Sequence, residues 1–356
     1  MSTPLSAAVR SASGSTPKTV AYLGNSLTVQ RAGYRPQLHD LLRNCWGQDL
    51  SEVNAGLGGV GSLACAALLD LLVTRHRPDL CLVECSAADM MGATPPRQIG
   101  PSIESIGRGL IDAGVTPVFL HLPWRDVPAA RDSVLAAYDE VARHLHIRTI
   151  DLWPVWTPHD GALLTDGQHL TRQGGVEVAQ AIADRLRGPL AVAPDACARP
   201  ALHPHRTRWV AAAGHSAVAA TPDTRVGRFR LTLPTIEVPV GGAVTITPPD
   251  GQAITALLVV ADTATGVVGI DTANGQETVQ LRDQWCDSPR IQAIPFAEPV
   301  WGAVTVRMTG AVHADRDTRW QVPAVQPAGT VLRWIGACLT GSDPDPGRNW
   351  WQGGSS

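Results

Sequence analysis

The sequence predicts an α/β domain built on a parallel β-sheet, followed by a second domain of antiparallel β-strands. Over residues 19–187, short apolar runs alternate with segments whose apolar residues recur at helical spacing, which is typical of successive βαβ units. Beyond residue 207, β-rich runs are separated by glycine, proline and Asn-Gly turns, which indicates an antiparallel sandwich. A length of 356 residues with 44% hydrophobic content favours two domains.

The first domain is expected to contain alternating strands and helices. The expected strands are residues 19–23, 51–56, 79–85, 116–122 and 147–153. The expected helices are residues 35–46, 62–75, 102–114, 131–145 and 172–187, the last with Thr171 as its N-cap. The strands are apolar without alternation, so helices should cover both faces of the sheet. Ligands bind at the carboxyl ends of strands in such sheets, so residues directly after each strand are the candidates for chemistry.

Composition shifts divide the chain into segments. We expect a flexible N-terminus over residues 1–18, before the α/β domain of residues 19–187. Residues 188–206 are rich in proline and alanine and lack periodicity, so a linker is predicted there. Residues 207–345 are predicted to form the β-sandwich, with a jelly-roll-like arrangement, and residues 346–356 a tail.

Charge, apolar runs and cysteine spacing argue against several kinds of partner, location and site. The net charge of −3 and the absence of like-charge runs argue against nucleic acid or an anionic membrane as a partner. The N-terminus lacks the apolar core of a secretory signal and no run approaches the roughly 18 apolar residues of a membrane span, so we expect a cytoplasmic protein. The 7 cysteines are scattered without a CxxC pair or a histidine cluster, so no disulfide framework and no metal site is predicted.

Polar residues follow the predicted strands where a parallel sheet would place a site. The first strand is followed by Gly24-Asn25-Ser26, and "LTDGQHLT" supplies Asp166 and His169 before the last helix. Residues three apart on a turn project to the same side, so a carboxylate at 166 can orient an imidazole at 169. With Ser26 they would form a nucleophile, a base and an orienting acid. The order Ser, Asp, His also occurs in α/β-hydrolases, but Ser26 lacks their GxSxG elbow.

Three motifs in this order resemble blocks one, two and five of the SGNH, or GDSL, hydrolase family. They are "GNSL" at 24–27, "NAGLGG" at 54–59 and "DGQH" at 166–169. The resemblance covers residues 19–187, about half of the chain. It implies a flavodoxin-like three-layer α/β/α fold and ester chemistry at a serine, without a metal or cofactor.

The resemblance also implies a role for each matching residue. Ser26 would be the nucleophile, His169 the base and Asp166 its partner. The amides of Ser26 and Gly59 would form the oxyanion hole, where the negative oxygen of the reacting carbonyl is held by hydrogen bonds.

Block three departs from the family pattern. The family has GxND after the third strand, and "VECSAAD" places Ala88 where the asparagine donor should be. A methyl group cannot donate a hydrogen bond, whereas Ser86 or Asn54 could replace that donor; Asp89 as a carboxylate only accepts. Asn25 and His121 also lie at strand ends, as residues that could line the site, although a structural role is an alternative for His121.

Three functions are compatible with these features. The first is an esterase that removes a short acyl group from a carbohydrate or a small biosynthetic intermediate, and the second is an acyltransferase that uses the same triad. The third is a catalytically silent carbohydrate-binding protein, because Ala88 weakens the site and 7 of the 11 tryptophans lie beyond residue 200. The expected partner is a small-molecule or carbohydrate ester, and a homo-oligomer stays open.

Overall fold

The computed structural model describes most of both predicted domains. The described residues are 16–126, 128–156, 162–187, 190, 198–203, 207–211, 221–226, 231–262, 265–281, 289–309 and 331–341. The predicted tail, most of the predicted N-terminal segment and much of the predicted linker lie outside these residues. No helix within the described ranges has the length and apolar character needed to cross a membrane.

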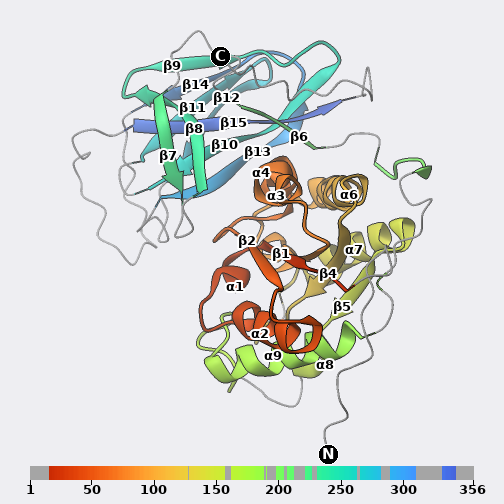
Figure 1. Cartoon of the computed structure of the whole chain (residues 1–356). Coiled ribbons are helices and arrows are strands. Elements are labelled where there is room, and N and C mark those ends of the chain that lie inside the picture. Colours follow the sequence, from red (N-terminus) through yellow and green to blue (C-terminus); the bar gives the residue numbers. More distant parts are fainter. Residues whose placement is uncertain are drawn as a thin grey trace, which may run out of the picture.

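A parallel sheet forms the centre of the first domain (Figure 1), as predicted. Its order is β2-β1-β3-β4-β5, and every neighbouring pair is parallel. The strands are β1 (Thr19–Gly24), β2 (Ser51–Gly56), β3 (Leu80–Glu84), β4 (Thr116–His121) and β5 (Arg148–Asp151). The turns after β1, β2 and β3 therefore meet at one edge of the sheet, where a ligand site is expected.

Helices cover both faces of this sheet, so the three-layer α/β/α architecture is confirmed. Ala21 and Leu23 of β1 join the apolar cluster on one face, whereas Val20 and Tyr22 join the cluster on the other. The first cluster includes residues of α3 (Ser62–Ala67), α4 (Leu69–Leu72), α6 (Pro96–Asp112) and α7 (Arg131–Leu145). The second includes residues of α1 (Ser26–Val29), α2 (Tyr34–Trp46) and α9 (Arg172–Arg185). The short helices α5 (Ser86–Met90) and α8 (Trp153–Trp156) follow β3 and β5.

Two helices differ from their predicted bounds by more than two residues. The segment predicted as one helix over 62–75 is divided into α3, α4 and the 3-10 turn η1 (Thr74–His76). The interruption is local to Leu68, because Leu68 N still donates to Ala64 O and Leu68 O still accepts from Leu72 N. Helix α6 begins at Pro96 rather than near residue 102, and a proline suits a first helical position because no hydrogen bond is needed there. Thr171 caps α9 as predicted, accepting from Gly174 N at 3.0 Å.

The second domain is a sandwich of two antiparallel sheets. The 6-stranded sheet contains β6 (Arg208–Ala211), β7 (Thr221–Val226), β8 (Leu231–Pro239), β10 (Gln252–Ala261), β13 (Arg290–Val300) and β15 (Val331–Gly341). The 4-stranded sheet contains β9 (Ala243–Ile246), β11 (Val267–Thr272), β12 (Gly275–Gln280) and β14 (Val304–Met308). Leu257 and Ile294 from the first sheet share one buried cluster with Val268 and Val306 from the second, which makes the two sheets a single β-rich domain.

The two domains are packed against each other through an apolar interface. The 6-stranded sheet lies over the helical layer that contains α3, α4 and α6 (Figure 1), and Leu258 and Ile291 of the sheet belong to the same buried cluster as that layer. Polar contacts lie beside this cluster: Arg97 of α6 forms an ion pair with Glu298 of β13 and donates to Phe296 O at 2.9 Å. Strand β13 is therefore fixed against the α/β domain.

The end of the predicted linker is also attached to α6. The buried Glu104 carboxylate accepts from the amides of Leu202 at 2.9 Å and His203 at 2.7 Å. Arg108, paired with Glu104 at 2.7 Å, donates to Pro200 O at 2.9 Å. These bonds hold the chain as it leaves the first domain for the second.

Candidate active site

Ser26 is the first residue of α1, immediately after β1 ends. Asn25 caps this helix, because its Oδ1 accepts from Leu27 N at 3.0 Å. Gly24 is required by close packing: a Cβ there would lie 2.3 Å from Thr28 Oγ1 and 2.5 Å from Glu84 O. The tight turn at the end of β1 thus presents the Ser26 side chain at the carboxyl edge of the sheet.

A buried carboxyl group lies beneath this turn. Glu84 Oε1 accepts from Asn25 Nδ2 at 3.2 Å, and Glu84 Oε2 lies 3.4 Å from Thr28 Oγ1. Burial raises the pKa of Glu84 to about 8, although the hydrogen bonds from Asn25 and Thr28 act in the opposite direction. The carboxyl is therefore neutral near pH 7, and it holds the residue that caps the Ser26 helix.

The imidazole of His169 connects Ser26 to Asp166. His169 Nε2 lies 3.0 Å from Ser26 Oγ, and His169 Nδ1 lies 2.8 Å from Asp166 Oδ2. The other carboxylate oxygen of Asp166 accepts from the amides of Gln168 at 2.8 Å and His169 at 2.7 Å. Partial burial alone would raise the pKa of Asp166, but these hydrogen bonds outweigh it and hold the pKa below its ordinary value. An ionised Asp166 is suited to orient an imidazole and to stabilise its protonated form.

Two further side chains hold the His169 loop. Gln30 donates from Nε2 to Leu170 O at 2.6 Å and accepts at Oε1 from Leu170 N at 3.1 Å. Arg125 donates its amide to Gly167 O at 2.9 Å and its Nη2 to Asp166 O at 2.5 Å. Because Gln30 directly follows α1, its two bonds fix the loop relative to the helix that carries Ser26.

The loop after β2 is positioned against the Ser26 turn. Leu57 N donates to Gly24 O at 2.8 Å, and Asp89 Oδ1 accepts from Ser62 N at 2.8 Å. Between these anchors Gly59 has φ +72°, a left-handed conformation that favours glycine. Within the described part of the chain, the Gly59 amide donates to no protein acceptor. Its N–H is therefore available to a ligand.

Among the described residues, the other predicted site residues form no hydrogen bond with the Ser26 hydroxyl. Ser86 and His121 are buried as a pair, with His121 Nδ1 3.3 Å from Ser86 Oγ. Asn25 is buried within the turn itself, and Asn54 Oδ1 accepts from Gly56 N at 3.1 Å. Ala88 is buried in α5.

Asp89, another predicted site residue, acts on the block-two loop. Besides Ser62 N, this buried carboxylate accepts from the Tyr138 hydroxyl at 2.7 Å. Burial raises its pKa, partly offset by its hydrogen bonds. Asp89 thus supports the loop that contains Gly59.

Sequence reasoning missed three residues that position this site: Glu84, Gln30 and Arg125. A single carboxyl at the end of the apolar run "DLCLVE" was a signal for Glu84, because buried carboxyls need partners. Gln30 and Arg125 had no such signal, since their roles depend on which loops meet in space.

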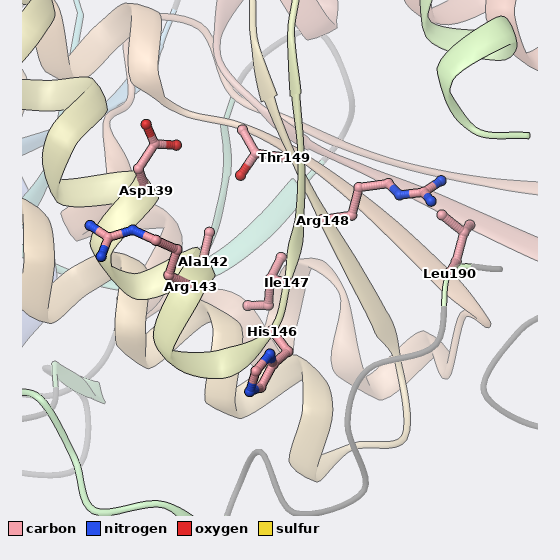
Figure 2. A pocket seen from close by; sticks show the side chains of 8 residues that line it. All are labelled: Asp139, Ala142, Arg143, His146, Ile147, Arg148, Thr149 and Leu190. Atoms are coloured by element: carbon pink, nitrogen blue, oxygen red, sulfur yellow. The ribbon is translucent and has the colours of Figure 1, made fainter. Parts of the chain in front are cut away.

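A hollow elsewhere on this domain is separate from the site. Figure 2 shows its lining, which includes Asp139 and Arg143 of α7, His146 in the following turn, and Arg148 at the start of β5. Since β5 is parallel to β1, its first residue lies at the edge of the sheet opposite the Ser26 turn.

At the carboxyl edge of this α/β sheet, a serine, a histidine and an aspartate lie next to one another. This arrangement is typical of serine hydrolases. Comparison with known proteins agrees with this class. Residues 22–175 match the model of the GDSL-like Lipase/Acylhydrolase family, and this part of the chain is a domain of that family. The chain is also 25% identical over 189 residues to an arylesterase of Vibrio mimicus, an alignment covering 49% of this chain and 92% of that protein.

Solved structures resemble the whole two-domain fold. A crystal structure of a two-domain esterase active on acetylated mannans has a TM-score of 0.64 at 15% identity and covers 91% of both chains. A second structure of a two-domain esterase active on acetylated mannans, co-crystallised with mannopentaose, has a TM-score of 0.66 at 16% identity and covers 92% of this chain and 91% of that one. An α/β hydrolase domain followed by a β-rich domain is therefore an architecture already found among esterases.

Proposed function

We propose that the protein is a serine esterase that removes a short acyl group through a Ser26–His169–Asp166 triad. The observation that carries this proposal is the chain of contacts from Ser26 Oγ to His169 Nε2 at 3.0 Å and from His169 Nδ1 to Asp166 Oδ2 at 2.8 Å. Both distances are those of hydrogen bonds, which a nucleophile, a base and an orienting acid require. Membership of an ester-hydrolase family supports the same chemistry.

The reaction proceeds through an acyl-enzyme. Ser26 Oγ attacks the ester carbonyl carbon as His169 Nε2 takes the hydroxyl proton, and Asp166 stabilises the resulting imidazolium. The amides of Ser26 and Gly59 donate to the oxyanion of the tetrahedral intermediate. When the intermediate collapses, the alcohol leaves with the proton from His169. Water then attacks the acyl-enzyme with His169 as base, releasing the acid and restoring Ser26.

The proposed substrate is an acetylated or similarly short-chain ester of a carbohydrate. The two-domain relative is described as active on acetylated mannans, and the other relative as an arylesterase. Ser26 is only partly buried and the His169 side chain is 21% exposed, so the hydroxyl is open to an ester on a bulky alcohol.

Acyl transfer to another hydroxyl is the second candidate. The observation that favours it is Ala88, because a site without the asparagine donor of block three differs from the usual hydrolytic site of the family. Product analysis with p-nitrophenyl acetate and mannose separates the two: free acetate alone supports the esterase, and acetylated mannose supports the transferase.

Substitution of the nucleophile tests the proposal. Ser26→Ala should abolish release of p-nitrophenol from p-nitrophenyl acetate, because no other hydroxyl lies within hydrogen-bond distance of His169 Nε2 among the described residues. Ser51→Ala, which alters an exposed serine at the start of β2, is the control and should keep full activity. Equal activity of the Ser26→Ala variant and the wild-type protein would contradict the proposal.

A further inference from the structure

The second domain brings an arginine to the candidate oxyanion hole. Arg290 is the first residue of β13, and a Cβ built on Gly59 would lie 2.5 Å from Arg290 Nη1 and 3.7 Å from its Cζ. The guanidinium thus lies where a side chain at position 59 would begin. Covalent geometry places a Cβ about 2.5 Å from its own backbone nitrogen, so Nη1 lies within about 5 Å of the Gly59 amide nitrogen.

The position of Arg290 is fixed by the sheet and by the domain interface. Arg290 pairs with Ala261 of β10, and its neighbour Ile291 is 2% exposed in the cluster that both domains share. Further along β13, Phe296 O and Glu298 contact Arg97 of α6. A group carried by a strand fixed at both ends is held more precisely than one on a free loop.

The chemistry of the guanidinium suits an anionic oxygen. Arg290 is partly buried, and burial lowers its pKa, but a guanidinium remains protonated in proteins. It carries five N–H donors and a charge whose field is stronger in a partly dehydrated site than in water. In block three, Ala88 has only a methyl group, and the Ser86 hydroxyl is buried beside His121 Nδ1 at 3.3 Å.

We propose that Arg290 is the donor that replaces the missing asparagine of block three, so that the second domain completes the oxyanion hole beside Gly59. This inference rests on the proposed esterase function. The oxyanion would accept hydrogen bonds from the amides of Ser26 and Gly59 and from the Arg290 guanidinium. The sandwich domain would then contribute to the chemical step.

The test compares variants of the full-length chain with p-nitrophenyl acetate, a neutral ester. Arg290→Gln should lower kcat by about 10²-fold to 10³-fold with KM changed by less than about threefold, the effect of losing one oxyanion donor. Arg307→Gln alters an exposed arginine on β14, in the other sheet of the same domain, so its kcat should stay near that of the wild-type protein. Addition of guanidinium ions should restore part of the kcat of Arg290→Ala, which a purely structural loss would not allow.

Three results would overturn the inference. The first is a kcat of Arg290→Gln within about threefold of the wild-type value. The second is an effect confined to KM for esters that carry an anionic group, and the third is an equal fall of kcat in Arg307→Gln. If Arg290→Gln and Arg290→Ala do not fold, Arg290→Lys is the variant to measure, because lysine keeps the positive charge but lacks the planar set of N–H donors. Its kcat should fall about tenfold at an unchanged melting temperature. An unchanged kcat would contradict the inference. Activity that survives in Ser26→Ala would instead contradict the proposed function itself.

Discussion

The two sides of the candidate active site are held in place by different parts of the chain. The Ser26 side is supported within the α/β domain, by Glu84 below the turn and by Gln30 beside the His169 loop. The Gly59 side is supported by Asp89 from its own domain and also touches Arg290 from the sandwich. The nucleophile and its base therefore need only the first domain, whereas the proposed oxyanion hole needs both.

The largest expected effect is on the Ser26 side. Asp166→Asn should lower kcat by about 10⁴-fold, because an amide cannot stabilise the imidazolium and can favour the wrong tautomer of His169. Binding of substrate should change little, which kcat and KM for p-nitrophenyl acetate will show. Asp184→Asn, a change on the exposed face of α9, is the control and should leave kcat unaffected. A fall of less than tenfold in Asp166→Asn would remove Asp166 from the triad.

The buried Glu84 carboxyl should make stability depend on pH. In the folded protein its pKa is about 8, against an ordinary value of 4.5. Between these values the unfolded chain loses a proton that the folded chain keeps, so the free energy of unfolding should fall by about 1.4 kcal/mol for each unit that pH rises. This contribution is complete below pH 4.5 and disappears as pH rises through 8.

Glu84→Gln isolates that contribution. The amide can still accept from Asn25 Nδ2 and donate to Thr28 Oγ1, yet it does not titrate. Between pH 5 and pH 8, urea unfolding should show the wild-type protein losing about 3 kcal/mol more than the variant. Glu140→Gln, at an exposed position of α7, should follow the wild-type curve. Parallel pH profiles for wild type and Glu84→Gln would show that Glu84 is ionised in the folded state.

The smallest effect is expected at Gln30. Gln30→Ala removes both hydrogen bonds to Leu170 and should let the His169 loop move away from Ser26, lowering kcat by about tenfold with little change in stability. Gln180→Ala, on the exposed face of α9, is a matched control without a contact to that loop. Pre-steady-state release of p-nitrophenol should slow in the first variant alone, and an unchanged rate would mean that Gln30 does not position the base.

The parallel sheet, its helical layers and the pairing of Asp166 with His169 were predictable because each depends on local patterns. That Ser26 lies near them was expected because residues that follow parallel strands share one edge of the sheet. Apolar runs define the strands, and the spacing of "DGQH" already places Asp166 and His169 together. Residues 207–345 were predicted to be β-rich without a separate strand being assigned to "RIQAIPFAEPV", whose two prolines are unfavourable inside a sheet. This segment forms β13, an edge strand with a register shift where Pro295 pairs with Ala256, and an edge tolerates proline.

The contribution of Arg290 could not be predicted because it depends on how the two domains are packed. Positions 59 and 290 are far apart in the sequence, and no motif around either residue predicts that the two are in contact. The roles of Glu84 and Gln30 depend in the same way on long-range contacts, with Asn25 and with Leu170. Local patterns and the family motifs thus predicted the residues of the proposed triad but not those that hold them in position.

Labelling with a fluorophosphonate probe shows whether Ser26 is an activated nucleophile. A phosphonate reacts only with a serine that a neighbouring base activates, and its phosphoryl oxygen occupies the oxyanion hole. Peptide mass spectrometry should find one phosphonylated residue, Ser26, and the Ser26→Ala and His169→Ala variants should not be labelled. Folded wild-type protein in which Ser26 stays unmodified, or in which another serine is labelled, would show that Ser26 is not the nucleophile.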